Sequence, residues 1–450
     1  MLENKDKKIV TRFAPSPTGH FHVGGIRSAL YNFLFARQNK GVYILRSEDT
    51  DKERSRKEYE DEFLELFDWL NLKYDLFFRQ SDRLEIHQKY LKIMLDNGTA
   101  YVSKETPTEK GQREEVIRFK NPNKKVTFED LVLGNITVDT TDLGDFVIAR
   151  DMNEPLYHLT VVIDDFEMGV THVIRGQEHT PNTARQILIQ EAIGAPRPIY
   201  AHLPLILNKN RAKLSKRDET VLPAVEYKKR GYLPEALLNF MALNGWNPGG
   251  EQEIFSLDEL IEKFDLSKVQ KGGGIFNPEK LEWINKEHMK LIPENDKNTE
   301  IIKRLKDNSI KSDEKFLLKL CPVIFEHISK WGDIDNMVRV GELDYYFNPP
   351  QYSDNLLYWK GEIKPEETIN HLQWIKKKLD SCDDEIFSNI ESIKNSVFDY
   401  ATENGRGQVL WPLRVALSGK DKSPDPFTLI YILGKEETVS RIDSAIVKLK

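Results

Sequence analysis

Cysteine and long apolar runs are both scarce in this sequence. The chain of 450 residues has two cysteines, Cys321 and Cys382, which lie far apart. The sequence therefore predicts no disulfide framework and no cysteine-rich zinc site, and it fits a reducing cytoplasm. No stretch approaches the roughly 18 apolar residues of a membrane span, and the opening MLENKDKKIV lacks the apolar core of a signal peptide. We expect a cytoplasmic protein that does not contact a membrane.

A surplus of positive charge is also missing. The net charge is -7, which argues against a protein that coats nucleic acid indiscriminately. Local basic surfaces for one particular RNA stay open, because binding follows local phosphate contacts rather than the total charge. Hydrophobic residues make up 39% and charged residues 30% of the chain, as in folded globular proteins. The length exceeds what one core holds, so we expect at least two domains.

A stretch rich in proline and glycine, TRFAPSPTGHFHVGG at residues 11–25, separates two regular elements. Before it, residues 9–14 are predicted to form a short buried strand. After it, apolar residues at 26, 29, 30, 33 and 34 have helical spacing, and VYILR at 42–46 follows as a second strand. Strand, helix and strand form a βαβ unit of a parallel sheet. Ligands bind beyond the carboxyl ends of such strands, where this stretch and the acidic SEDTD at 47–51 both lie.

The stretch at 11–25 has the composition of an anion site. It matches neither a GxGxxG motif nor a P-loop, but it precedes a helix, whose first amides attract anions. His20 and His22 can donate hydrogen bonds to phosphate oxygens, and Gly24 and Gly25 leave the backbone bare for a flat base. From these residues alone, the alternative is an ordinary loop with surface histidines.

A second cluster, KNRAKLSKR at residues 209–217, holds five cations and no acid. Such a charge run is usually a solvated loop. The segment KLSKR, from Lys213 to Arg217, also suits the neutralisation of a triphosphate whose leaving group is pyrophosphate. Phosphoryl chemistry depends chiefly on positioning and charge stabilisation, so cations can take the place of a nucleophile. The motifs around the two clusters decide between these interpretations.

Several motifs follow one another in the order of a known family. They are PSPTG-x-x-HVGG, LRSEDTD, YHLTVVIDD, THVIRGQEH, LPLIL, KLSKRD and GYLPEALLNF. In order and spacing the chain resembles bacterial-type glutamyl-tRNA synthetases, class I enzymes whose HIGH and KMSKS signatures correspond to HVGG and KLSKR here. The resemblance is close from residue 9 to about 290 and looser beyond. It implies an α/β fold, with a doubly wound parallel sheet of the Rossmann type, an α+β insertion and an all-α C-terminal anticodon-binding region.

The resemblance also implies five segments along the chain. We expect the catalytic domain at 1–84 and 155–212, interrupted by an acceptor-binding insertion at 85–154. The KMSKS loop and a helical stem-contact domain are expected at 213–298, and the anticodon-binding region at 299–450. The insertion is short, and the cysteine cluster that holds zinc in some relatives is missing. We therefore expect no structural zinc and no other protein-bound metal.

The resemblance assigns the ATP chemistry to the two signature motifs. In that family the histidine of HIGH contacts phosphate, the glycines lie beneath adenine, and the second lysine of KMSKS stabilises pyrophosphate. Carried over, the catalytic residues are His22, Lys213, Ser215, Lys216 and Arg217, and the ATP-binding residues are Thr18, His22, Gly24, Gly25, Glu178, His179, Leu205, Ile206 and Lys216. ATP is expected to bind as its Mg²⁺ complex.

The resemblance also implies a pocket for the amino acid glutamate, made of Arg12, Ala14, Ser16, Glu48, Tyr157 and Arg175. Arginine suits a side-chain carboxylate because its planar fork grips both oxygens and stays charged. Glu48 matches the residue that takes the substrate ammonium. Glutamine would leave a desolvated guanidinium without its anion, at a cost of roughly 3–5 kcal/mol, which discriminates without an editing domain. The alternative is that Arg12 and Arg175 make internal ion pairs.

The expected substrates are L-glutamate, ATP and tRNA(Glu), and we expect a monomer. Some relatives carry an arginine near CPVIFEH (321–327) that selects the glutamate anticodon. Our alignment puts Ile324 there, so we hypothesise that tRNA(Gln) is also charged with glutamate. The competing interpretations are a glutaminyl-tRNA synthetase and a non-catalytic tRNA-binding relative. Such relatives usually lose the histidine or the second lysine, whereas His22 and Lys216 are both present.

Overall fold

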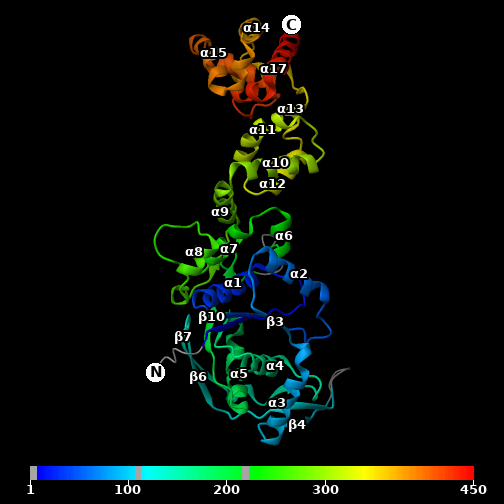
Figure 1. Ribbon diagram of the computed structural model, residues 1–450, viewed down its shortest axis with the longest axis vertical. Helices are drawn as coiled ribbons and strands as arrows, with labels where there is room; N and C mark the ends of the chain where they lie inside the picture. The colour runs from blue at the N-terminus through cyan, green and yellow to red at the C-terminus, as the bar shows by residue number, and fades with distance from the viewer. Residues whose placement is uncertain (1–7, 107–112, 215–221) are drawn as a thin grey trace. The chain divides into compact units, whose positions relative to one another are not determined.

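The computed structural model describes residues 8–106, 113–214 and 222–450 of the chain. Contacts divide the chain into two compact units, Met1–His288 and Met289–Lys450. The sheets belong to the first unit, and the second is built of helices (Figure 1). The division into five segments is finer than these two units and stays a prediction.

The predicted βαβ unit is present near the start of the first unit. β1 (Val10–Phe13) and β2 (Val42–Ser47) pair in parallel, and α1 (Val23–Gln38) connects them. The helix begins three residues before the predicted apolar pattern, because the carbonyl of His22 already accepts bonds from the amides three and four residues on. It ends before Lys40, whose φ of 51° turns the chain towards β2.

A seven-stranded sheet forms the centre of the first unit, in the order β3-β2-β1-β9-β10-β6-β7. Every pairing is parallel except that of β7 with β6. Its other strands are β3 (Leu76–Arg79), β6 (Lys125–Asp130), β7 (Gly134–Asp139), β9 (His172–Gly176) and β10 (Ile199–Leu203). Since β1 is flanked by β2 on one side and by the much later β9 on the other, the predicted doubly wound sheet is confirmed. The winding reverses at β1 and β9, and ligands bind such sheets beyond the carboxyl ends there.

The region between β3 and β9 contributes both a second sheet and an edge hairpin. β4 (Ala100–Lys104), β5 (Glu115–Phe119) and β8 (Phe146–Ala149) form a three-stranded antiparallel sheet, consistent with the predicted α+β insertion. The β6–β7 hairpin instead extends the central sheet next to β10, which the sequence pattern did not predict. Alternate residues of β6, among them Phe128 and Asp130, are buried. One face of this strand is therefore buried where the hairpin joins the edge of the sheet.

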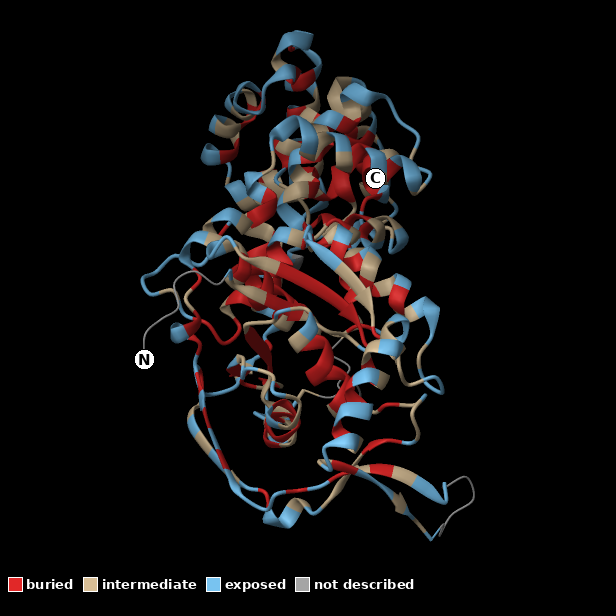
Figure 2. Ribbon diagram, turned by 60° about the horizontal axis from the view of Figure 1, so that its bottom comes forward, coloured by how far each residue is buried: buried red, intermediate tan, exposed pale blue. Residues whose placement is uncertain are grey.

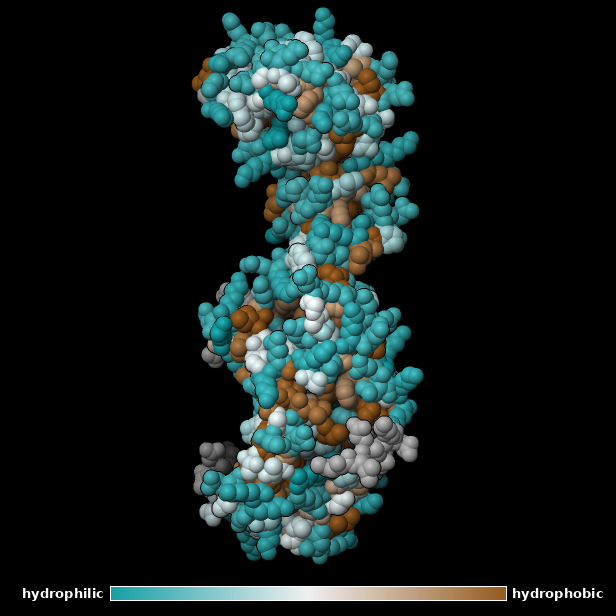
Figure 3. Space-filling model, turned by 90° about the vertical axis from the view of Figure 1, so that its left-hand side faces the viewer, coloured by the Kyte–Doolittle hydropathy of each residue, from teal (hydrophilic) through white to brown (hydrophobic). Residues whose placement is uncertain are grey.

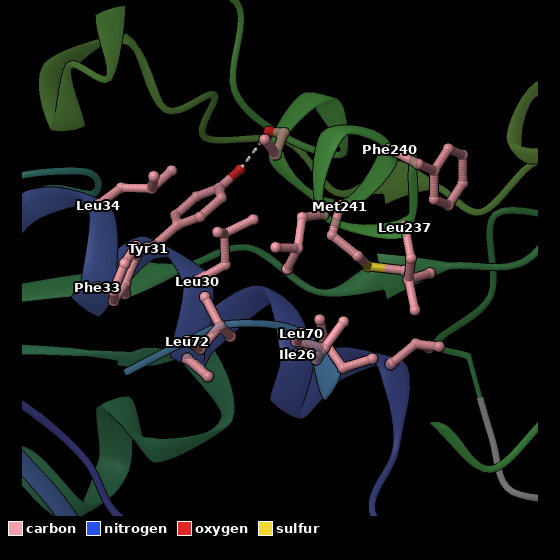
Figure 4. Close-up of a cluster of buried hydrophobic side chains, with 14 of the residues drawn as sticks. Ile26, Leu30, Tyr31, Phe33, Leu34, Leu70, Leu72, Leu237, Phe240 and Met241 are labelled. Atoms are coloured by element: carbon pink, nitrogen blue, oxygen red, sulfur yellow. Dashed lines mark hydrogen bonds between the residues drawn. The ribbon is translucent and has the colours of Figure 1, made fainter. Parts of the chain in front are cut away.

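Helices accompany the strands of the first unit. They are α2 (Lys57–Trp69), α3 (Leu84–Asp96), α4 (Tyr157–Glu167), α5 (Thr180–Ile193), α6 (Ala224–Lys229), α7 (Pro234–Leu243), α8 (Leu257–Lys263) and α9 (Pro278–Leu291). Figure 4 shows part of the core between α1 and α7, where Leu30 and Tyr31 lie near Met241. The Tyr31 hydroxyl donates to the carbonyl of Ala242 at 2.9 Å, which satisfies the polar end of the buried ring.

The second unit is helical throughout its regular structure, as predicted. Its helices are α10 (Glu294–Asp307), α11 (Glu314–His327), α12 (Gly332–Arg339), α13 (Asp344–Phe347), α14 (Pro365–Asp380), α15 (Ile390–Glu403), α16 (Arg406–Ser418) and α17 (Pro426–Leu449). Ile324 is fully buried in α11, beside Leu320 and Cys321. An uncharged core residue therefore stands at the position that we align with the anticodon-selecting arginine, and the hypothesis that tRNA(Gln) is also charged stays a prediction.

Within the central sheet, β2, β9 and β10 consist mostly of buried residues, whereas β3 and β7 at the two edges contain none (Figure 2). Hydrophilic side chains cover most of the face shown in Figure 3. Within the described ranges, we find no helix whose length and apolar character would let it cross a membrane. Cys321 and Cys382 are both free thiols in buried positions. The expectation that no zinc is bound stays a prediction.

Candidate active site

The predicted site residues gather at the carboxyl edge of the central sheet. Ala14 and Ser16 follow β1, and Glu48 follows β2. Glu178 follows β9, and Leu205 follows β10. Because these strands are neighbours and parallel, their carboxyl ends meet at one edge. Segments that are far apart in the sequence are thereby brought together.

The loop after β1 is anchored to the segment after β2. The carbonyl of Pro15 accepts a hydrogen bond from the amide of Glu48 at 2.9 Å. Within the loop, the amide of Thr18 donates to the carbonyl of Ser16 at 2.8 Å. These bonds fix the shape of the loop while the Ser16 residue stays exposed.

The two glycines at the start of α1 have different surroundings. A Cβ on Gly25 would lie 2.6 Å from Cε2 of the buried Phe21 ring, so only glycine fits there. A Cβ on Gly24 would have no described atom within 4 Å. A side chain at position 25 would therefore clash with Phe21, whereas Gly24 leaves an open face at the N-terminus of the helix. The roles of both glycines in ATP binding stay predictions.

The two histidines before α1 have different environments. His22 is the N-cap residue of the helix, and its backbone forms a β-bridge with Pro223. The His20 side chain is 58% exposed, and its Nδ1 lies 2.7 Å from Oε2 of Glu62. His22 therefore lies at the helix N-terminus, where anions bind, while His20 contacts a carboxylate.

Arg27, which the motifs did not single out, ties α1 to the chain after β10. The residue is 3% exposed, and its Nη1 donates to the carbonyl of Asn244 at 3.0 Å while Nη2 donates to the carbonyl of Pro204. Pro204 directly precedes the predicted ATP-binding backbone at Leu205 and Ile206. A short strand, β11, begins at Ile206 and pairs with β12 (Gly274–Ile275). This backbone is therefore held from two sides.

A buried ionic network underlies the predicted amino-acid pocket. Nε of Arg12 lies 3.1 Å from Oδ1 of Asp165, and Nη1 of Arg46 lies 2.7 Å from the same oxygen. Nη2 of Arg46 also donates to Oε1 of Glu48 at 3.1 Å. The alternative of an internal ion pair is therefore realised for Arg12, but through Nε alone. Its Nη1 and Nη2 form no hydrogen bond with a described residue.

The two carboxylates of this network respond differently to burial. Burial would raise the pKa of Asp165, but Arg12 and Arg46 outweigh it and hold that pKa below its usual value. For Glu48 burial dominates, and its pKa is raised despite Arg46 and Arg12. An ammonium group beside Glu48 would oppose that shift, which suits the predicted role of this residue.

Arg175, on β9, is buried and has no carboxylate partner among the described residues. Its Nε donates to Nε2 of His202 at 3.2 Å, and its Nη2 donates to Oγ1 of Thr183 at 2.8 Å. Nη1 is buried and has no hydrogen-bond partner in the described part of the chain. Burial lowers the pKa of Arg175 from its usual value. Within the described ranges no ion pair balances its charge, which leaves the group suited to an anion of a ligand.

Tyr157 and His179 lie near Arg175. Tyr157 begins α4, and His179 ends the 3-10 helix η3 (Gln177–His179), where its Nδ1 lies 3.3 Å from the Tyr157 hydroxyl. Burial and the nearby Arg175 lower the pKa of His179 to about 4, so its ring is neutral at pH 7. Glu178 is exposed at the same edge.

The described part of the second signature motif ends at Leu214. The amide of Leu214 donates to the carbonyl of Ile206 at 3.0 Å, and Lys213 forms a β-bridge with Leu207, so the backbone folds back on β11. Lys213 is exposed in this turn. The other predicted members of the motif lie outside the described residues: Ser215, Lys216 and Arg217.

Similarity to known proteins agrees with this geometry. A family model for tRNA synthetases class I (E and Q), catalytic domain, matches residues 8–115 and 107–283, and one for an anticodon binding domain matches residues 286–446. The glutamate–tRNA ligase of Aquifex aeolicus (strain VF5) is 38% identical to the chain, over 98% of this chain and 99% of its own length. The chain belongs to the glutamate–tRNA ligases of class I.

Other members of this synthetase family match the chain over similar lengths. The glutamate–tRNA ligase of Thermodesulfovibrio yellowstonii is 37% identical over 96% of this chain and 98% of its own. A crystal structure of a glutamate tRNA ligase from Elizabethkingia meningosepticum CCUG26117, in complex with its amino acid, superposes with a TM-score of 0.89. It is 33% identical and covers 99% of this chain and 100% of its own.

Three buried residues that contact predicted site residues were not themselves predicted: Arg46, Asp165 and His202. A charged residue next to an apolar run was the available signal, since Arg46 ends VYILR and Asp165 ends TVVIDD. Charged side chains are almost never fully buried unless they are paired. The pairing itself depends on β2 and α4 meeting in space, which the local pattern does not encode.

Proposed function

We propose that the chain activates L-glutamate with ATP and transfers it to tRNA(Glu). The observation that carries the proposal is Arg175, a buried guanidinium whose Nη1 has no described partner. The groups around the pocket are three guanidinium groups and two carboxylates: Arg12, Arg46, Arg175, Glu48 and Asp165. The surplus of one positive charge is balanced by glutamate, whose two carboxylates and one ammonium carry one net negative charge.

The proposed first step joins glutamate to AMP. The α-carboxylate of glutamate attacks the α-phosphorus of ATP, which forms glutamyl-adenylate and releases pyrophosphate. His22 and the amides at the start of α1 bind phosphate, and the open face at Gly24 receives the base. Lys216, with Lys213, Ser215 and Arg217, stabilises the departing pyrophosphate, and Mg²⁺ enters with ATP. The glutamyl group then passes to the 2′-hydroxyl of the terminal adenosine of the tRNA, with release of AMP.

Arg12 and Arg175 are proposed to bind the side-chain carboxylate, with Tyr157, Ala14 and Ser16 lining the pocket. Glu48 accepts the ammonium group. Glutamine would leave a desolvated guanidinium without an anion, which costs roughly 3–5 kcal/mol. This penalty supports selection of glutamate over glutamine without an editing domain.

The experiment that tests this function is ATP–pyrophosphate exchange with glutamate and with glutamine, each with and without bulk bacterial tRNA. We expect exchange with glutamate and none with glutamine, a result that would support the pocket assignment. Exchange with glutamine would overturn that assignment. The absence of exchange under every condition would instead indicate a tRNA-binding relative that has kept its motifs without the chemistry.

Three finer points belong to the same proposal. Charging of tRNA(Gln) with glutamate is proposed because Ile324 stands where some relatives carry the anticodon-selecting arginine. Charging assays on purified tRNA(Glu) and tRNA(Gln) decide the point. The chain is proposed to act in the cytoplasm as a monomer, since each site residue named here comes from one chain. The molar mass measured by light scattering during turnover tests whether the active species is a monomer.

A further inference from the structure

Arg175 and His202 are neighbours across two strands of the central sheet. β9 and β10 pair in parallel with Arg175 opposite His202, so both side chains project from the same face. Nε of Arg175 lies 3.2 Å from Nε2 of His202, and both residues are buried. A guanidinium nitrogen can only donate, so Nε2 must accept and carries no proton.

The tautomer of His202 is set by Asp130. Nδ1 of His202 lies 2.6 Å from Oδ2 of Asp130, and since Nε2 is the acceptor, Nδ1 holds the proton and donates it. The second carboxylate oxygen, Oδ1, accepts from the amides of Val132 and Leu133 at 3.0 and 2.8 Å. Asp130 ends β6, the hairpin strand that the insertion adds to the sheet. A residue outside the predicted catalytic segments therefore orients a ring in the pocket wall.

Two fixed contacts determine the plane of the Arg175 guanidinium. His202 holds Nε, and Thr183 on α5 holds Nη2 at 2.8 Å. The Thr183 oxygen also lies 3.1 Å from Nε2 of His202, so the three side chains form one cluster. Because the guanidinium is planar, fixing two nitrogens also fixes the direction of Nη1, the nitrogen without a described partner.

We propose that His202, held in one tautomer by Asp130, is a positioning residue that aims Nη1 of Arg175 at the side-chain carboxylate of glutamate. The inference rests on the proposed function. It assigns part of the selectivity for the acidic amino acid to Asp130, a residue of the insertion hairpin that is not proposed to contact glutamate or ATP. Without the Nε contact the guanidinium can rotate. It then binds the substrate carboxylate more weakly than a guanidinium held in one orientation.

The test replaces His202 in two ways and uses His172 as a matched control. His202→Leu removes the acceptor for Nε, whereas His202→Gln keeps a side-chain oxygen that can accept from it. His172 is also a buried histidine of the central sheet. It begins β9, at the end of the strand away from Arg175, and it contacts Thr171 and Phe35. His172→Leu and His172→Gln therefore report the general cost of losing a buried imidazole from this sheet.

The measurements are KM and kcat for glutamate and glutamine, and KM for ATP, in ATP–pyrophosphate exchange with bulk bacterial tRNA present, together with the unfolding midpoint of each variant. His202→Leu is expected to raise KM for glutamate about 10- to 100-fold, as for loss of a hydrogen bond to a charged group, and to leave KM for ATP unchanged. The preference for glutamate over glutamine should fall by a similar factor. His202→Gln should recover most of both, and the His172 variants should change neither.

Asp130→Asn provides a second reading if His202→Leu does not fold. The amide can accept on one side only, so either the turn at Val132 and Leu133 or the Nδ1 proton of His202 loses its acceptor. A selective rise in KM for glutamate supports the proposal. An unchanged KM and preference in folded His202→Leu or Asp130→Asn would overturn it. If the wild-type chain itself shows no glutamate-dependent exchange, the proposed function fails, which is a separate outcome.

Discussion

Arg12 on β1 and Asp165 on α4 form an ion pair inside the first unit, with Nε of the arginine 3.1 Å from Oδ1 of the aspartate. Their side chains are 5% and 8% exposed. The contact uses the one guanidinium nitrogen that lies away from the fork, so the Nη1 and Nη2 edge stays available for a carboxylate. The same ion pair thus stabilises the fold and orients the guanidinium that we propose to bind the substrate.

Asp165→Asn should therefore impair both stability and substrate binding. The substitution leaves Arg12 and Arg46 with a neutral neighbour, and breaking a buried pair costs roughly 3–5 kcal/mol of the free energy of unfolding. Denaturant unfolding measures this loss, and KM for glutamate should rise in parallel. Asp151→Asn is the control, because its partner Arg113 is 45% exposed and such pairs contribute only about 0–1 kcal/mol. Equal losses in the two variants would contradict the role of Asp165.

Arg175→Gln should separate function from stability. Arg175 has no ion-pair partner among the described residues, so its removal relieves a buried charge instead of breaking a pair. We expect KM for glutamate to rise about 100-fold or more, consistent with 3–5 kcal/mol for an unpaired substrate carboxylate, while the thermal midpoint does not fall. A lower midpoint with unchanged KM would assign Arg175 a structural role instead.

The catalytic fold could be predicted from the sequence where local patterns and connectivity agree. Strand, helix and strand at 10–47 follow from an apolar run, a helical period and a second apolar run, and they predict a parallel sheet. The doubly wound order was expected from the resemblance to class I synthetases. The place of the β6–β7 hairpin could not be predicted in this way. Its alternating pattern indicates that one face is buried, but it does not indicate which strand the hairpin pairs with. Its neighbour β10 lies far along the chain, and register between distant strands is a tertiary property.

The candidate site could be predicted only in part for the same reason. The motifs led to Arg12, Glu48 and Arg175, all of which gather at the carboxyl edge of the sheet. The hydrogen-bond partners of the two arginines, Asp165 and His202, belong to other segments and are recognised only once the fold brings α4 and β10 beside them. Roles for the second signature motif stay predictions, since most of it lies outside the described residues.

The stability of the first unit should fall as the pH is lowered from 6.5 to 4. Burial lowers the pKa of His172 from 6.5 to about 4, so in this window the unfolded chain binds a proton that the folded chain does not. Stability is then present above pH 6.5 and is lost on acidification, by on the order of 3 kcal/mol for a shift of this size. His172→Gln should give a shallower decline in unfolding free energy between pH 6.5 and 4. An unchanged slope would exclude His172 as a contributor.

Alanine at the two glycines of α1 should have opposite effects. Gly25→Ala places a methyl 2.6 Å from the Phe21 ring, which packs edge-on against Phe13, so we expect a loss of about 1–3 kcal/mol in unfolding free energy. Gly24→Ala meets no described atom within 4 Å, and alanine favours a helix over glycine by up to about 1 kcal/mol, so stability should hold or rise. The new methyl would occupy the open face proposed for adenine, and KM for ATP should increase while KM for glutamate stays the same. Exchange kinetics together with unfolding of both variants measure this contrast, and an unchanged KM for ATP in Gly24→Ala would remove Gly24 from the ATP site.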